Sequence, residues 1–186
     1  MVRSFPLYVH LGQGASISIN LDASPWGLGA YLEINRHIVS FFTCVITVEE
    51  AALLGHEIGS SAAQQTFEAL AALVALRAWK DHWIEQRGTI CVRSDSISSL
   101  VLVLKLKTSG PGPGIIAREI ALDVADALYR PDVVEHVPGV ANLICDMLSR
   151  QFQPNPKSKY VLPLQLVHVK ELVLPVRSKQ YYRTLS

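Results

Sequence analysis

Cysteine, net charge and long apolar runs are all scarce in this sequence of 186 residues. The three cysteines, Cys44, Cys91 and Cys145, are too few and too scattered for a disulfide framework or a zinc site, and they suit a reducing compartment. No run of 18 apolar residues is present, so we expect no membrane-spanning segment, and residues 1–10 lack the apolar stretch of a signal peptide. These absences predict an intracellular, cytoplasmic protein.

Charge of either sign is modest, and it is unevenly distributed. The 17 Lys and Arg nearly balance the 16 Asp and Glu, so a net charge of +1 does not by itself indicate a nucleic-acid binder. Residues 1–150 hold 11 basic and 15 acidic side chains, a net charge of −4, whereas residues 151–186 hold 6 basic and 1 acidic, a net charge of +5. The division falls at a Pro-containing stretch, 151–156, which is typical of a domain boundary. We therefore predict a lead-in at 1–15, one globular domain at 16–150 and a basic tail at 151–186.

The tail has two alternative roles. Its basic residues would attract a polyanion such as a nucleic acid. Its apolar stretch, 161–176, would instead pack on the domain or on a neighbouring one. The sequence favours neither role over the other.

Hydrophobic residues make up 49% of the chain, which is enough for a full core. Residues 16–22 alternate strictly between apolar and polar side chains, as in a half-buried strand that ends in an acid. Strands at 27–32 and 37–42, joined by a hairpin turn at 35–36, would complete an antiparallel meander.

The second half of the domain is predicted to mix helices and strands. A Ser-x-x-Gln capping box at 61–64 predicts a helix over 64–83 that Gly88 ends, and residues 44–60 remain unassigned. A strand is predicted at 89–95, and the segment at 96–107 fits a strand by its alternation and a helix by its length. A loop at 110–114 follows, and then a helix at 116–128 before Pro131. The last predicted elements are a strand at 133–137 and a helix at 141–150. This order predicts an α/β fold with a mixed five-stranded sheet, three antiparallel strands followed by two more, flanked by helices.

Four acidic residues could reach one edge of such a sheet. Asp22 and Asp95 end predicted strands, Glu68 is a solitary acid on an apolar helix, and Asp146 lies on the last helix. Taken singly, each is explained as a turn former or a solvated helix residue. Clustered carboxylates, however, repel one another unless cations bind between them, and their hard oxygens suit Mg²⁺ or Mn²⁺. Two such ions about 4 Å apart can activate water for phosphodiester hydrolysis, although chain spacing leaves the convergence of the acids open.

Four motifs around these acids resemble those of ribonuclease H domains from reverse-transcribing retroelements, of the gypsy type and related ones. Leu21–Tyr31 resembles their opening strand pair, Phe67–Trp79 their Glu-bearing helix, and Val92–Ser96 their third acidic motif. His136–Arg150 is similar to their closing motif. The resemblance covers roughly residues 16–150. A retroviral-type integrase uses a different order of acids and fits poorly.

The resemblance implies a ribonuclease H-like fold and a two-metal-ion enzyme. The reaction would be hydrolysis of the RNA strand of RNA–DNA hybrids during reverse transcription, leaving a 3′-hydroxyl and a 5′-phosphate. Asp22 would bridge two Mg²⁺ ions, for which Mn²⁺ could substitute, and Asp146 would help to hold the ion that activates water. Glu68 and Asp95 would hold the leaving-group ion, and Glu68 would sense the 2′-hydroxyl that distinguishes RNA from DNA. Residues 96–107 would then be a helix.

The implied partners are an RNA–DNA hybrid and a reverse transcriptase polymerase domain upstream in the same polyprotein. The setting would be the cytoplasm, a retroelement particle or the nucleus. Ser24 and Trp26, just past Asp22, would approach the RNA backbone or simply form a turn. Trp79 and Trp83 are more typical of a core than of base stacking.

The chain also departs from the family pattern. Many ribonucleases H carry a His in a flexible loop before the last Asp, but no His lies between Pro138 and Asp146, and we predict His136 to be a non-catalytic strand residue. The basic handle helix of cellular ribonucleases H has no counterpart after Asp95. One alternative is a catalytically silent ribonuclease H-like structural or nucleic-acid-binding module, and another is a domesticated host protein acting on a different substrate. The presence of all four acids favours the enzyme.

Overall fold

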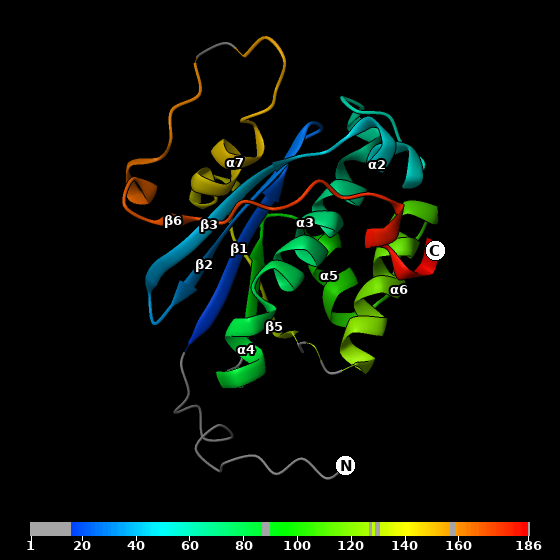
Figure 1. Cartoon of the computed structure of the whole chain (residues 1–186), viewed down its shortest axis with the longest axis horizontal. Coiled ribbons are helices and arrows are strands. Elements are labelled where there is room, and N and C mark those ends of the chain that lie inside the picture. The colour runs from blue at the N-terminus through cyan, green and yellow to red at the C-terminus, as the bar shows by residue number, and fades with distance from the viewer. Residues whose placement is uncertain (1–15, 87–89, 127, 129–130, 157–158, 186) are drawn as a thin grey trace.

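The centre of the molecule is a mixed sheet of six strands in the order β5-β4-β1-β2-β3-β6 (Figure 1). The computed structural model describes residues 16–86, 90–126, 128, 131–156 and 159–185. The strands are β1 (Ile17–Ala23), β2 (Gly27–Ile34), β3 (His37–Val45), β4 (Ile90–Ser94), β5 (Pro131–His136) and β6 (Lys170–Glu171). β1, β2 and β3 form the predicted antiparallel meander, β4 and β5 run parallel to β1, and β6 runs parallel to β3. The predicted five-stranded sheet therefore differs from the observed one only by the two-residue strand β6, which the tail supplies.

Helices cover both faces of the sheet. They are α2 (Val48–Leu53), α3 (Gln64–Ala78), α4 (Lys80–Gln86), α5 (Ile97–Lys105), α6 (Pro111–Ala125) and α7 (Leu143–Ser149), with short 3₁₀ turns between several of them. α3 lies against β1 and β2, with α5 and α6 packed beside it, while α7 covers the opposite face (Figure 1). No helix in the described parts of the chain is both long enough and apolar enough to cross a membrane.

β1 places its apolar and polar residues on opposite faces, as the alternation predicts, but the expected half-buried strand is wrong, because α3 and α7 pack on the two faces and all seven residues are buried. Ile17, Ile19 and Leu21 lie in the core under α3, and Asp22 lies on the other face. The hairpin after β2 is confirmed as well, because Asn35 and Arg36 both have positive φ, at 51° and 68°, as a tight two-residue turn requires.

Two predictions about the segment 61–83 are wrong, namely a continuous helix over 64–83 and a capping box at its start. The helical hydrogen bonding breaks at Trp79, where the backbone leaves helical geometry and α4 starts anew. The capping box does not form either, because the side chain of Gln64 donates to the carbonyl oxygen of Ala23 at 2.6 Å. Trp79 and Trp83 are buried, as predicted, and the Trp79 ring packs against Phe42.

The segment at 96–107 is a helix, as the resemblance implied and against its local alternation. Ser96 caps α5 by accepting a hydrogen bond from the backbone of Ser99 at 3.3 Å. The predicted loop at 110–114 is wrong, because α6 already begins at Pro111. Only residues 106–110 separate α5 from α6, so the handle helix is absent between them, as expected.

The described part of the tail packs onto the domain. Arg177 is buried and pairs with Glu50 of α2, with N–O distances of 2.6 and 2.7 Å. The hydroxyl of Tyr182 donates to the same carboxylate at 2.6 Å. Glu50 is fully buried, so these contacts neutralise a charge that would otherwise lie in the core. Arg183 is also ion-paired, with Asp123, which leaves fewer basic groups to face a polyanion.

Replacing Arg177 with Met should therefore destabilise the whole domain. The variant leaves the Glu50 carboxylate buried without a cation, which typically costs about 3–5 kcal/mol in free energy of unfolding. Chemical denaturation would measure this loss, with Lys179→Met as the control, since Lys179 is an exposed neighbour and should change stability by less than about 0.5 kcal/mol. Equal unfolding free energies for the two variants would contradict a stabilising role for the tail.

Candidate active site

Asp22 and Asp95 meet at one edge of the sheet. Asp22 is the sixth residue of β1, and Asp95 follows the last residue of β4 directly. Since the two strands are parallel neighbours, with Asn20 aligned with Arg93, their carboxyl ends emerge side by side. Electrostatic repulsion acts between Asp22 and Asp95 and between Asp22 and Asp146.

Close packing of α7 against β2 brings the last acid to this edge. A Cβ atom built on Gly29 would lie 2.4 Å from Cβ of Leu148 and 2.6 Å from the backbone nitrogen of Ser149. Such distances do not occur between real atoms, so only glycine allows the helix to approach this closely. Gly29 is aligned with Asp22 across the β1–β2 pair, so the close approach places α7 directly over the Asp22 carboxylate.

Hydrogen bonds from side chains of α7, its preceding turn and the β1–β2 connection help to hold α7 in this position. The hydroxyl of Ser149 donates to Oδ2 of Asp22 at 3.0 Å, and the hydroxyl of Ser24 donates to the carbonyl oxygen of Ser149 at 2.6 Å. Nδ2 of Asn142 donates to the carbonyl oxygen of Leu21 at 3.1 Å. Sequence reasoning missed Ser149 and Asn142, although both lie within the closing motif that carries the resemblance.

Burial and like charges raise the pKa of Asp22 from 3.8 to about 7. Burial is the largest cause, and the neighbouring carboxylates of Asp95 and, more weakly, Asp146 act in the same direction. The hydrogen bonds from Ser149 and from the Ala23 backbone oppose the shift without cancelling it. The folded protein thus holds Asp22 in surroundings that disfavour its negative charge.

Glu68 lies next to Asp95 on the α3 side of the site. Burial raises the pKa of Glu68, hydrogen bonds from Ser96 and Gln64 lower it, and the charge of Asp95 raises it again. Nε2 of Gln64 donates to Oε1 of Glu68 at 3.1 Å while also holding the end of β1 through Ala23. The same amide therefore ties Glu68 to the strand that carries Asp22.

Asp146 is more open to solvent than Asp22. Its side chain is 40% exposed, and Oδ1 accepts a hydrogen bond from Nε of Arg150 at 2.6 Å. The turn that precedes α7 also reaches Asp95, because a Cβ on Gly139 would lie 3.4 Å from Oδ2 of that residue. The structure therefore brings all four predicted acids around the same end of β1 and β4.

The chemistry of this donor set fits a divalent cation. All four groups are carboxylates, the ligands that Mg²⁺ and Mn²⁺ prefer. Burial is the main cause of the raised pKa values of Asp22 and Glu68, and the charge of Asp95 adds to both. Within the described ranges, no three His, Cys, Asp or Glu side chains lie close enough together to enclose an ion as they stand. The acids are near enough to one another to interact electrostatically, but their side chains do not surround a metal ion.

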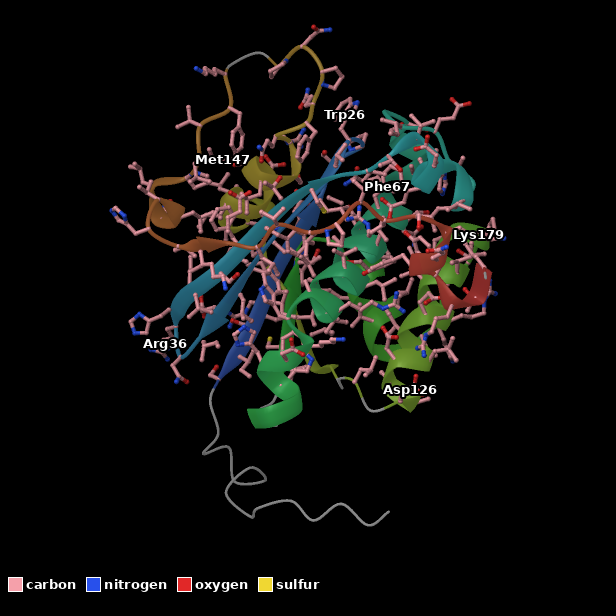
Figure 2. All side chains as sticks on the ribbon, in the orientation of Figure 1. Trp26, Arg36, Phe67, Asp126, Met147 and Lys179 are labelled. Carbon is pink, nitrogen blue, oxygen red and sulfur yellow. The ribbon has the colours of Figure 1, made fainter. Side chains whose placement is uncertain are left out.

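The weaker candidates are placed less favourably for contact with a substrate. Ser24 is buried, and its hydroxyl accepts from the backbone of Trp26 and Gly27 while donating to Ser149, which is the turn role. Trp26 is partly exposed and lies in the upper part of Figure 2. Cys145 is a fully buried thiol, as predicted. His136 is the exposed last residue of β5, which confirms its place in a strand.

Comparison with known proteins identifies the fold. No protein-family model and no curated protein sequence matches this chain. Among solved structures, RNase H1 from the halophilic archaeon Halobacterium salinarum NRC-1 is similar, with a TM-score of 0.50 at 18% identity over 76% of this chain and 98% of that one. LC11-RNase H1, isolated from compost by a metagenomic approach, reaches a TM-score of 0.49 at 18% identity, over 73% of this chain and 91% of that one. The likeness to the archaeal protein shows that this chain has an RNase H-like fold.

Replacing Asp22 with Asn should stabilise the protein at neutral and alkaline pH. Because the folded-state pKa of Asp22 is about 7 and its ordinary value is 3.8, the folded state binds the proton more tightly, and ionisation destabilises the fold progressively as pH rises from about 4 to 7. Thermal unfolding should give similar melting temperatures for wild type and Asp22→Asn near pH 4 and a higher one for the variant at pH 8.

The exposed acid Asp81 supplies a control for this measurement. Asp81→Asn should follow the wild-type pH profile. Mg²⁺ should raise the melting temperature of the wild type by binding the folded state, and it should raise that of Asp22→Asn less. Parallel pH profiles for Asp22→Asn and wild type would contradict the repulsion at this site.

Proposed function

We propose that the chain is a metal-dependent endonuclease that hydrolyses the RNA strand of RNA–DNA hybrids during reverse transcription. The observation that carries the proposal is the placement of Asp22, a buried carboxylate with a pKa raised to about 7, beside Asp95 and Asp146 on an RNase H-like fold. A buried acid whose pKa is raised by burial and by a neighbouring carboxylate, as that of Asp22 is, is typical of a catalytic site. The retroelement setting and the upstream reverse transcriptase domain rest on the motif resemblance alone.

The four carboxylates would hold two Mg²⁺ ions, for which Mn²⁺ could substitute. Asp22 would contact both ions, Asp146 would serve the side of the attacking water, and Glu68 and Asp95 would serve the side of the leaving oxygen. When bound, such ions lower the pKa of water and stabilise the charge on the leaving oxygen of a phosphodiester.

The chain's own residues prepare this site in advance. Ser149 and Ser24 orient Asp22 and α7 relative to each other, and Gln64 orients Glu68. The burial of Asp22 keeps bulk water from its carboxylate and strengthens every electrostatic interaction that it makes. Glu68, which would lie beside the scissile strand, would accept a hydrogen bond from a ribose 2′-hydroxyl, a group that DNA lacks.

A catalytically silent ribonuclease H-like module is the alternative function. Such a module would have a structural or nucleic-acid-binding role in a retroelement or a domesticated host protein, and it would have no need of an uncompensated buried carboxylate. The raised pKa of Asp22 therefore favours the enzyme.

Replacing Asp95 with Asn should abolish cleavage while the protein remains folded. The substitution keeps the shape of the side chain but removes one charged metal ligand. Loss of a residue that only hydrogen-bonds to a metal ligand typically lowers activity by about 10- to 100-fold, so loss of a ligand itself should lower it by more than about 100-fold. A labelled RNA–DNA hybrid incubated with Mg²⁺ would show the loss, and circular dichroism would verify folding. If the wild-type protein binds the hybrid but cuts no RNA in Mg²⁺ or Mn²⁺, the proposed enzyme activity is wrong. The catalytically silent module would then be the better interpretation.

His136→Ala is expected to change turnover only modestly, by less than about threefold, as a surface substitution away from the reacting groups. His136 ends β5 on the surface, so a well-folded variant keeps all four carboxylates in place. The same hybrid-cleavage assay applies. A hundredfold loss of turnover in the folded variant would instead make His136 part of the reaction.

A further inference from the structure

Arg150 is a cation that the structure places directly on one of the proposed metal ligands, Asp146. It follows the last residue of α7, and its Nε atom donates to Oδ1 of Asp146 at 2.6 Å. The proposed reaction gives Arg150 no role, yet the pair occupies an oxygen that a divalent cation would need.

The backbone of Arg150 is firmly held, whereas its side chain is open to solvent. The preceding residue, Ser149, is bonded to both Asp22 and Ser24, and the backbone nitrogen of Arg150 donates to the carbonyl oxygen of Asp146 at 3.2 Å. The side chain itself is 52% exposed. Its guanidinium group can therefore change partners while its position along α7 stays the same.

Most of the hydrogen-bonding capacity of Arg150 is unused. A guanidinium carries five N–H donors, and in the described part of the chain only the Nε donor makes a hydrogen bond. The two terminal nitrogens form a planar fork that matches two oxygens of a phosphate group. Since residues 1–150 carry a net charge of −4, a phosphate that approaches the acids needs a cation at the rim of the site.

We propose that Arg150 exchanges partners on substrate binding. It neutralises Asp146 before metal and hybrid arrive, and it binds a backbone phosphate of the hybrid once a divalent cation has taken its place at Asp146. This inference rests on the proposed function and assigns Arg150 as a substrate-binding residue of the same site.

The exchange predicts opposite effects on metal and on hybrid when the charge is removed. In Arg150→Gln the competitor for Asp146 is gone, so the Mg²⁺ concentration that gives half of the maximal rise in melting temperature should fall by about two- to fivefold, the range for loss of an exposed ion pair. Arg118→Gln is the matched control, because Arg118 is exposed on α6, which packs on α3 and α5. The control should leave the Mg²⁺ midpoint unchanged.

Hybrid binding is measured in proteins that also carry Asp95→Asn, so that the RNA stays intact. There, Arg150→Gln should weaken binding and reduce the slope of log affinity against log salt concentration by about 1, the value for one lost phosphate contact. Arg150→Lys keeps the charge, so it should retain the Mg²⁺ midpoint and the salt slope of the parent protein.

A purely structural role for Arg150 would weaken both metal and hybrid binding together, and that outcome would overturn the exchange. An unchanged Mg²⁺ midpoint or an unchanged salt slope in Arg150→Gln would overturn it as well. Neither measurement depends on cleavage. Failure of the wild type to cut RNA would therefore count against the proposed function, whereas failure of these two measurements would count against Arg150 alone.

Discussion

The close approach of α7 to β2 at Gly29 is the constraint on which the site depends. No other residue fits there, because any Cβ would lie within 2.4 Å of Leu148. The approach allows Ser149 to reach Asp22, and the hydroxyl of Thr43 on β3 secures the same helix by donating to the carbonyl oxygen of Leu148 at 2.8 Å. The absence of a side chain at Gly29 thus determines where Asp146, 117 positions further along the chain, lies relative to Asp22.

Two buried carboxylates, Glu50 and Asp22, have very different electrostatic surroundings. Glu50 is fully buried, and Arg177 and Tyr182 both bond to it, so its charge is compensated and ties the tail to α2. Asp22 is 6% exposed, and in the described residues it receives the hydroxyl of Ser149 but no cation. The first arrangement stabilises the fold, while the second stores an electrostatic cost that a bound cation would relieve. Arg150 pairs with Asp146 rather than with Asp22, and both side chains of this pair are partly exposed to solvent.

Local pattern predicted the strands and most helices, and it failed where distant partners intervene. The alternation at 17–21 correctly identified the core-facing residues of β1, but it gave no sign that α7 buries the opposite face as well. The alternation of Leu and Val in α5 was not, because a short apolar run fits a buried helix as well as a strand. Gln64 has the spacing of a capping residue, but its side chain bonds to Ala23 on another element. Trp79 interrupts the helix to pack on Phe42 and to donate to Ser40, neither of which lies near it in the sequence.

By itself, the sequence determined the types of acid, their order along the chain and the strands and helices that carry them, since these depend on neighbours within a few residues. The RNase H-like fold followed from the same order, through the motif resemblance. Only the tertiary structure decided that Asp22 is buried, that α7 lies over it, and that Arg177 reaches back across 127 residues to Glu50. Burial and electrostatic coupling are properties of distances in space, and residues far apart in the chain acquire those distances only when the core packs.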